Sequence, residues 1–265
     1  MLTSEQIAQF QADGFLNGGQ VLSNEEVETL RAEVMRVIDE RERDDIPQPV
    51  HVRNMSRDES KAVWQIVNIW EASGPFRDLI SRKDITTGIA QLTGATELRI
   101  WHDQIQYKPP QTGGTTHWHQ DAPLWPIIRP MTEVTAWVAL DDADETNGCM
   151  SMVRGSHQWG NNIAYLQQLE EINKMPTEFE GKELQVASCT VKKGEVHFHH
   201  ALTWHGSHDN NSDRPRRAIA LHYMTNETYY VASGEHVMKE FVEVEDGEQL
   251  RGRHFPQVYP EGQVA

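Results

Sequence analysis

Residues 98–140 read LRIWHDQIQYKPPQTGGTTHWHQDAPLWPIIRPMTEVTAWVAL, and this stretch decides the fold class. Short segments rich in strand-forming residues are separated by turn signals such as Pro109-Pro110 and Thr112-Gly-Gly114. This alternation of strand-forming segments and turn signals continues to about residue 225. We expect strands at about 98–107, 115–121, 133–140, 149–153, 186–192, 195–200 and 216–225. Many short strands separated by turns indicate a β-sandwich or jelly roll.

The N-terminal region has a helical pattern instead. Two capping boxes, Thr3-Ser-Glu-Gln6 and Ser23-Asn-Glu-Glu26, predict two helix starts, with a strand-like link between the helices. Residues 75–93 predict one or two further helices. Residues 41–60 are charged and contain two prolines, which predicts a loop. Apolar residues recur at helical spacing after the second capping box, at Val27, Leu30, Val34, Val37 and Ile38.

These patterns predict a single domain over residues 1–265. It would consist of a mostly helical N-terminal part (1–95), a β core (96–225) and a C-terminal tail (226–265). Polar residues 158–183 interrupt the strands, which predicts an insertion over one mouth of the barrel. We expect this insertion, the 41–60 loop and the tail to close over a bound substrate, because loops carry specificity.

Charge and hydropathy narrow the classes of partner. The chain has 40 Asp and Glu against 24 Lys and Arg, a net charge of −16, which repels nucleic acid and anionic membranes. The longest apolar run, Val134–Leu140, is far shorter than the roughly 18 residues of a membrane span. Two cysteines, Cys149 and Cys189, exclude a disulfide framework. With no leader-like N-terminus, we expect a cytoplasmic protein that has no nucleic-acid, membrane or obligatory protein partner.

The strongest chemical signal is His117-Trp-His119-Gln-Asp121. Residues i and i+2 of a strand share a face, so His119 and Asp121 can bind one metal ion. The His-rich segment 197–205 offers several candidates for a third ligand. A 2-His-1-carboxylate triad suits Fe(II) and leaves coordination positions open. The same ligands can hold Zn²⁺ and activate water, so a zinc hydrolase or lyase is an alternative.

Further motifs follow in order along the chain. His205 lies 86 residues after His119, and Arg216 lies eleven residues after His205. The motifs are Val134–Leu140 followed by Asp, Asn147-Gly-Cys-Met, Arg154-Gly-Ser-His157, Trp204-His205-Gly-Ser207-His-Asp-Asn210 and Arg216-Arg217-Ala. In these motifs the sequence resembles the phytanoyl-CoA dioxygenase family of Fe(II)/2-oxoglutarate oxygenases. The resemblance covers most of the chain to about Thr225 and implies a mainly β fold with flanking helices around a double-stranded β-helix (jelly-roll, cupin-like) core.

The resemblance also implies which residues form the site. His119, Asp121 and His205 match the iron ligands, and His205 alone among the later histidines heads the His-Gly-Ser-x-x-Asn pattern. Arg216 matches the arginine that binds the distal carboxylate of 2-oxoglutarate, a task that suits the planar guanidinium fork. Ser207 is placed to add a hydroxyl donor. Trp137, Gln104 and, in a less distinctive stretch, Gln65 match positions that contact the co-substrate.

Purely structural roles remain open for several of these residues. Arg216 could pair with an acidic residue, and strand alternation places its neighbour Arg217 on the opposite face. Trp137 could belong to the core or to a pocket wall. Gln104 could face solvent, and Ser207 could be a turn hydroxyl.

Four other histidines lie near the motifs. We expect His199 and His200 to pack in the core or to support the ligands. His117 shares strand parity with His119, and His222 shares it with Arg216, so either could point inward.

The implied enzyme is a 2-oxoglutarate-dependent non-haem iron dioxygenase that uses Fe(II), 2-oxoglutarate and O₂. Related halogenases replace the carboxylate ligand with a small residue, so the presence of Asp121 favours hydroxylation. We expect hydroxylation of an unactivated C–H in a small-molecule metabolite, with release of succinate and CO₂. Desaturation, epimerisation, cyclisation and a non-catalytic sensor role are alternatives. Acyl-CoA and free metabolites are both candidate substrates, although the charge of −16 disfavours polyanionic CoA.

Overall fold

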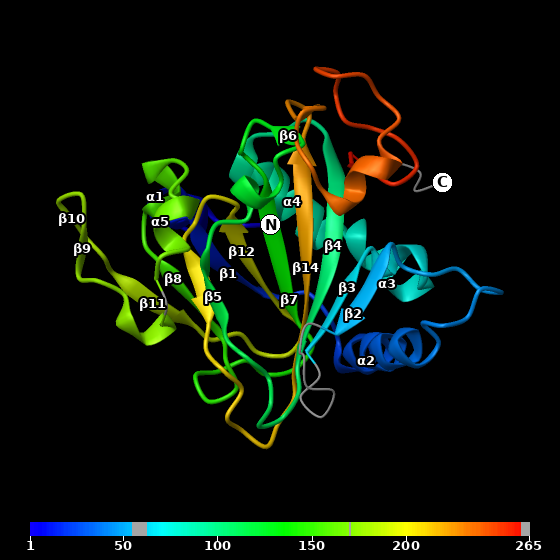
Figure 1. The fold of residues 1–265 in the computed structure, drawn as a ribbon, viewed down its shortest axis with the longest axis horizontal. Coiled ribbons are helices and arrows are strands. Elements are labelled where there is room, and N and C mark those ends of the chain that lie inside the picture. Colours follow the sequence, from blue (N-terminus) through cyan, green and yellow to red (C-terminus); the bar gives the residue numbers. More distant parts are fainter. Residues whose placement is uncertain (55–62, 170, 261–265) are drawn as a thin grey trace.

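Two antiparallel sheets enclose the interior of the protein in a computed structural model that describes residues 1–54, 63–169 and 171–260 (Figure 1). The major sheet has the order β1-β12-β7-β14-β4-β3-β2, and β16 also pairs with β4. Its strands are β1 (Phe15–Gln20), β2 (His51–Asn54), β3 (Trp64–Val67), β4 (Leu98–Lys108), β7 (Val134–Ala139), β12 (Glu195–His200), β14 (Arg216–Thr225) and β16 (Gln257–Tyr259). This arrangement confirms the expected jelly-roll core.

The minor sheet has the order β11-β8-β13-β5 and carries two of the motifs. Its strands are β5 (Thr116–His119), β8 (Met150–Val153), β11 (Val186–Cys189) and β13 (His205–Ser207). Two small ribbons lie outside both sheets, one of β6 (Ile128–Arg129) with β15 (Tyr229–Tyr230) and one of β9 (Glu178–Phe179) with β10 (Lys182–Glu183).

Four helices share one hydrophobic core with the outer face of the major sheet: α1 (Ser4–Asp13), α2 (Asn24–Asp39), α3 (Gly74–Ile80) and α4 (Lys83–Thr93). Both predicted capping boxes are present, with Thr3 bonded to Gln6 and Ser23 bonded to Glu26. The five apolar residues predicted on one face of α2 are all buried. Local sequence signals therefore located these helices correctly.

Alternation along the strands divides the major sheet into two chemically different faces. On β14, Ile219, Leu221 and Tyr223 belong to the core under the helices. Arg216 and His222, at the opposite parity, line cavities between the sheets. A residue of the major sheet thus meets either the helices or the interior, according to its parity.

The N-terminal part is less helical than expected, because it contributes three strands to the major sheet. Strand β1 pairs with β12, and β2 and β3 extend the sheet beyond β4. The prediction of a loop over 41–60 was wrong at its centre, where β2 occupies His51–Asn54. Residues 55–60 of that prediction lie outside the described residues.

The insertion at 158–183 packs on the outer face of the minor sheet rather than over the barrel mouth. Trp118 points outward from β5, opposite to His117 and His119, and its Nε1 donates to the Ile172 carbonyl at 3.0 Å. The insertion, which contains α5 (Ile163–Leu166), forms a hydrophobic cluster with this tryptophan and with Trp204. Its apolar side chains cover Trp118 and Trp204, and none of its described residues lines either cavity, so closure over a substrate stays a prediction.

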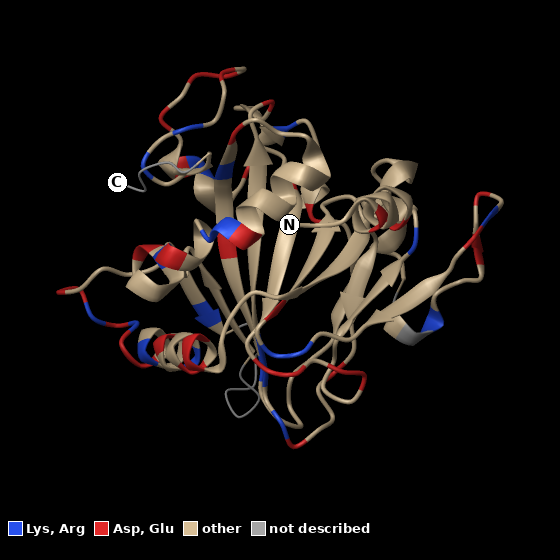
Figure 2. Cartoon of the chain, turned by 180° about the vertical axis from the view of Figure 1, so that it is seen from behind, with Lys and Arg blue, Asp and Glu red and all other residues tan. Residues whose placement is uncertain are grey.

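Charged residues lie mainly on helices and loops. Figure 2 marks acidic and basic residues along α2 and on the connecting loops, and few on the strands between them. Among the described residues, no helix is long and apolar enough to cross a membrane.

Phe198 of β12 provides a test of how the helices are held on the sheet. The side chain is 1% exposed, and a Cβ atom added at Gly88 of α4 or Gly18 of β1 would lie 3.1 Å or 2.5 Å from its ring. Because this packing leaves no room for compensation, Phe198→Ala should lower the free energy of unfolding by about 3–5 kcal/mol in urea titrations. Met35→Ala, on the exposed side of α2, should change it by less than about 0.5 kcal/mol. Equal effects of the two truncations would contradict this packing.

Candidate active site

The space between the two sheets contains two adjoining cavities of about 460 and about 680 Å³. The smaller cavity reaches His119 and Asp121, and the larger one reaches Lys108 and Arg216. Both are lined by Gln65, Gln104, Gln106, Thr116 and His117. One continuous polar surface therefore connects the two ends of the site.

His119, Asp121 and His205 form the one cluster among the described residues that could hold a metal ion, with ligand atoms all within 4.8 Å of one another. His119 and His205 are register partners in β5 and β13. Their Nε2 atoms lie 3.5 Å and 3.6 Å from Asp121 Oδ1. The two strands therefore bring together residues that are 86 positions apart in the sequence.

Asp121 reaches this cluster by a route that differs from the strand alternation we predicted. Strand β5 ends at His119, and Asp121 has helical backbone angles (φ −72°, ψ −53°) at the start of the turn η3 (Ala122–Leu124). The predicted strand at 115–121 is therefore two residues too long at this end. The bend after His119, rather than the pleat of a strand, turns the carboxylate toward the imidazoles.

The Nδ1 atoms of both cluster histidines are held by backbone carbonyls. His119 Nδ1 lies 2.8 Å from the His117 carbonyl oxygen, and His205 Nδ1 lies 2.9 Å from that of Thr203. A carbonyl oxygen can only accept, so each Nδ1 carries the hydrogen and each Nε2 presents a lone pair beside Asp121. This is the tautomer that a metal ligand needs, and the fold fixes it in advance.

Burial and charge set the protonation of the cluster. Burial would raise the pKa of Asp121, but the neighbouring His205 and His119 hold it well below its ordinary value. Burial and the charge of His119 lower the pKa of His205, whereas the hydrogen bond and charge of Asp121 outweigh burial and raise the pKa of His119. A cation binds only the neutral form of His119, through Nε2, so its affinity should rise with pH as the protonated fraction falls.

The second oxygen of Asp121 is supported from the major sheet. His199 Nε2 and Thr135 Oγ1 each lie 3.3 Å from Oδ2. Thr135 Oγ1 also lies 2.8 Å from His222 Nδ1. The hydroxyl can donate to the carboxylate while it accepts from the imidazole, which fixes Asp121 and points His222 inward. His199 thus supports the carboxylate, whereas His200 packs near His157.

Arg216 is buried at the other end of the site. Its guanidinium lies 5.5 Å from the centre of the Trp137 ring, and its Nη2 donates to Ser207 Oγ at 3.4 Å. Its Nε and Nη1 atoms are buried without a hydrogen-bond partner among the described residues. Burial lowers the pKa of Arg216 to about 10, so it remains charged at neutral pH. Two unpartnered donors on a buried cation are costly, and an anion would satisfy them.

The remaining predicted co-substrate residues lie around this end. Trp137 belongs to the core, where it packs with Ala218 and Ala220 and contacts the guanidinium, and it lines neither cavity. Gln104 lines both cavities rather than facing solvent, and Gln65 lines them from β3. Ser207 is buried on β13 and is not a turn residue.

Sequence reasoning missed Gln106 and Lys108, which line the cavity beside Arg216. Gln106 accepts from Trp137 Nε1 at 3.3 Å. Lys108 donates from Nζ to Ser207 Oγ at 2.7 Å. The available signal was strand parity, because both residues follow Gln104 at steps of two along β4.

Three histidines form a wall of the smaller cavity: His102, His222 and His236. Burial and the other two rings lower the pKa of His102 well below its ordinary value. Burial lowers the pKa of both His222 and His236 to about 4. All three are therefore neutral near pH 7, and Trp125 packs edge-on against His102 and His222.

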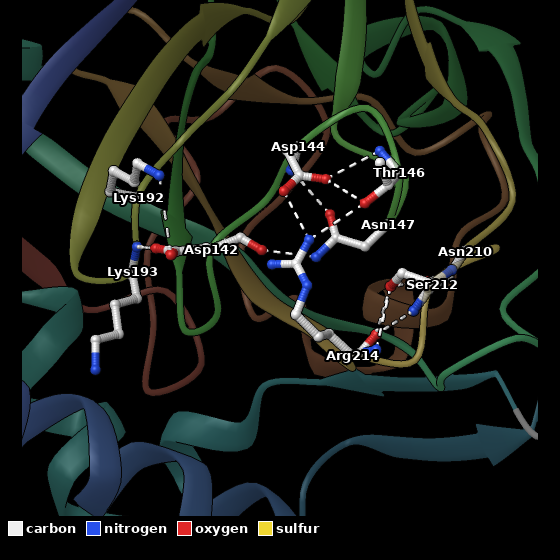
Figure 3. A network of polar contacts seen from close by, with 9 residues as sticks. All are labelled: Asp142, Asp144, Thr146, Asn147, Lys192, Lys193, Asn210, Ser212 and Arg214. Carbon is white, nitrogen blue, oxygen red and sulfur yellow. Dashed lines mark hydrogen bonds and ion pairs between the residues drawn. The ribbon is translucent and has the colours of Figure 1, made fainter.

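Polar contacts join the loop between β7 and β8 (residues 140–149) to the loop between β13 and β14 (residues 208–215) (Figure 3). Arg214 Nη2 donates to Asp144 at 2.7 Å, and Asn210 Nδ2 donates to the Arg214 carbonyl at 2.7 Å. Asn147 ties the first loop internally by donating to the Asp142 carbonyl at 2.7 Å. Because the second loop joins β13 to β14, this network fixes the positions of Ser207 and Arg216.

The adjacent arginines Arg216 and Arg217 provide a matched test of the buried charge. Arg217 lies on the opposite face and donates to both oxygens of Asp141, at 2.8 Å and 2.9 Å. Arg217→Met should lower the free energy of unfolding of the ligand-free protein by about 1–3 kcal/mol. Arg216→Met should leave it unchanged or raise it by about 1 kcal/mol, because the unpartnered buried cation is removed. A larger loss for Arg216→Met in urea titrations would show that the guanidinium is already satisfied.

Known proteins with similar sequences belong to one family. The sequence profile of the phytanoyl-CoA dioxygenase (PhyH) family matches residues 10–218. Ectoine dioxygenase of Bordetella bronchiseptica is 27% identical over 244 residues, which is 85% of this chain and 76% of that protein. The peroxisomal phytanoyl-CoA dioxygenase of Rattus norvegicus is 24% identical over 262 residues, 92% of this chain and 76% of the relative.

Solved structures share the fold. The non-haem α-ketoglutarate-dependent carbocyclase SnoK from nogalamycin biosynthesis superposes with a TM-score of 0.76 at 24% identity, covering 97% of this chain and 96% of SnoK. EctD from S. alaskensis gives a TM-score of 0.69 at 21% identity, covering 87% and 80% of the two chains. The family profile spans most of the chain, including all three residues of the candidate metal cluster. The chain therefore belongs to the phytanoyl-CoA dioxygenase family.

Proposed function

We propose that this protein is an Fe(II)- and 2-oxoglutarate-dependent dioxygenase that hydroxylates a C–H bond of a small polar metabolite and releases succinate and CO₂. The observation that carries the proposal is the pairing of two sites in one cavity system. A cation site of His119, Asp121 and His205 lies at one end, and an anion site with Arg216 at the other. An oxygenase that binds a metal and a dicarboxylate together requires both sites.

The donor set fits Fe(II). Two neutral imidazoles and one carboxylate are the ligands of non-haem iron oxygenases, and such a triad leaves positions open for a co-substrate and O₂. Both Nε2 lone pairs already face Asp121, so binding needs no change of tautomer. His119, Asp121 and His205 would hold the metal.

The anion end fits the distal carboxylate of 2-oxoglutarate. Nη1 of Arg216 has no partner among the described residues, and together with the second hydrogen of Nη2 it forms a guanidinium fork that a carboxylate matches with two charge-assisted bonds. Ser207 adds a hydroxyl beside it. Gln104 and Gln65 would line the space between the carboxylate and the metal, and Trp137 packs against the guanidinium.

When bound, the iron supplies the oxygen chemistry, with 2-oxoglutarate as the source of two electrons. The chain's own residues bind, orient and shield the reactants. Arg216 and Ser207 would fix one end of the co-substrate so that its other end reaches the metal. Thr135 and His199 hold Asp121 in place from behind, and the helices and both sheets exclude water from the interior.

The smaller cavity favours a polar substrate over a fatty acyl chain. Its wall next to the metal ligands carries the neutral imidazoles of His102, His222 and His236 and the amides of Gln104 and Gln106. His222, His236 and Gln106 each have one polar atom bonded within the protein, but an aliphatic chain would leave the remaining polar atoms of this wall unpaired, at a cost of about 1–3 kcal/mol for each buried polar group. A small molecule with hydroxyl, amide or carbonyl groups would satisfy them.

Substitution of the ligands tests the metal site. His119→Ala, Asp121→Ala and His205→Ala should each weaken Fe(II) binding at least 100-fold in anaerobic competition titrations, because each removes one of three ligands. Succinate formation should fall to background. His254→Ala removes a histidine that bonds Glu71 instead, and it should retain the wild-type metal affinity. Unchanged iron affinity in the ligand variants would refute the assignment.

Anaerobic titration separates the oxygenase from a zinc hydrolase on the same triad. Addition of 2-oxoglutarate to the Fe(II) protein should produce a weak visible charge-transfer band. Arg216→Ala should need at least tenfold more 2-oxoglutarate to form it, since loss of a charge-assisted pair costs roughly 1.5–3 kcal/mol. If iron binds but no band forms at any concentration, the zinc alternative is favoured instead.

A further inference from the structure

Lys108 is a buried lysine that has no role in the proposed function so far. It ends β4, is 3% exposed and lies at the anion end of the cavity with Arg216. Its Nζ atom contacts Ser207 Oγ at 2.7 Å, the His208 carbonyl oxygen at 2.6 Å and the Ser207 carbonyl oxygen at 3.3 Å. All three partners lie on β13 or directly after it.

The protonation of Lys108 determines where the Ser207 hydroxyl hydrogen points. An ammonium group has three N–H donors, which match its three contacts, so Ser207 Oγ would accept from it. Arg216 Nη2 also donates to Ser207 Oγ, and the serine hydrogen is then free to donate to an anion bound at Arg216. A neutral amine has only two N–H donors, which the two carbonyl oxygens occupy. Its lone pair would then accept the Ser207 hydrogen, which could no longer donate to that anion.

We propose that Lys108 is a positioning residue for the distal carboxylate of 2-oxoglutarate, and that its protonated form turns the Ser207 hydroxyl hydrogen toward that carboxylate. The inference rests on the proposed function. Together with the unpartnered Nη1 of Arg216, the serine hydroxyl would present two donors to one carboxylate. Lys108 itself acts through Ser207, because its own donors are taken by β13 and the residue after it.

Binding of the co-substrate should therefore be coupled to uptake of a proton. Burial, followed by the charge of Arg216, lowers the pKa of Lys108 to about 6, while Asp209 and Cys149 partly oppose this shift. These are the titratable groups that face it, from β14, the β13–β14 loop and the residue before β8. Near pH 7.5 the free protein thus holds mostly neutral Lys108. A carboxylate beside Arg216 and Ser207 would raise the pKa, and the proton would come from the buffer.

The test is calorimetric titration of the Mn(II)-loaded protein with 2-oxoglutarate in the absence of O₂. Measurements at pH 7.5 in buffers of different ionisation enthalpy should show uptake of about one proton by the wild-type protein. Its affinity should fall by up to about tenfold per pH unit above pH 6. Lys108→Met should bind about tenfold more weakly at pH 6, where the wild-type lysine is half protonated, with a smaller difference at pH 8 and no uptake.

A double-mutant cycle with Ser207→Ala isolates the positioning role. If Lys108 acts through Ser207, the double variant should bind no more weakly than Ser207→Ala alone. Lys174→Met, which removes a lysine that is 73% exposed on the insertion, is the matched control and should behave as wild type. Mn(II) affinity should be equal in all variants.

The outcomes separate the two proposals. If 2-oxoglutarate does not bind the wild-type protein, the proposed function fails. If it binds without proton uptake, or if the effects of Lys108→Met and Ser207→Ala add, the inference about Lys108 is overturned and the proposed function stands. The proton count in the wild-type protein decides the matter even if Lys108→Met does not fold.

Discussion

Burial of the major sheet on both faces is the constraint on which the rest of the structure depends. One face packs against the helices, mainly through apolar side chains such as Ile219 and Leu221, and its Arg217 is paired with Asp141. The other face closes the interior, where burial makes unpaired polar groups costly. Polar residues there persist because they bond one another, as His222, Thr135 and Asp121 do. Arg216 departs from this, with two donors that no described residue satisfies, and so does one ring nitrogen each of His102, His197 and His199.

This constraint divides the interior into a cation end and an anion end. Both ends use backbone atoms of the minor sheet as fixed partners. Carbonyls before His119 and His205 hold the imidazole hydrogens, and carbonyls of Ser207 and His208 hold Lys108. The minor sheet and its flanking residues therefore contribute more than metal ligands. Their main-chain carbonyls place the hydrogen of His119 and His205 on Nδ1, and they occupy two of the N–H donors of Lys108.

Much of this could be predicted from the sequence. Capping boxes and periodicity located the helices, and alternating strand formers located the long strands of the jelly roll. The metal cluster and Arg216 were found from motif order and spacing, which is why they survived errors in local structure. Parity alone also separated Arg216 from Arg217 correctly.

The errors arose where tertiary packing outweighs local pattern. Strand β13 has only three residues and a central glycine, so no periodicity marks it. The insertion at 158–183 packs where it does because Trp118 faces outward from the minor sheet. The insertion is mostly polar in composition, which hid the few apolar residues that cover the Trp118 ring. Lys108 could not be identified as a partner of Ser207, because the two residues are 99 positions apart in the sequence and lie on different sheets.

Strand β1 adds a consequence for the order in which the protein is completed. Phe15 is paired with His199, so strand β1 finds its partner only when synthesis has reached the strand that contains His199. The same is true of β4, which waits for β14. Such long-range pairing slows folding and leaves edges exposed during synthesis. During synthesis, strands β1 and β4 must therefore be kept from pairing with other chains until β12 and β14 have emerged. In the folded protein these edges are paired and the risk is gone.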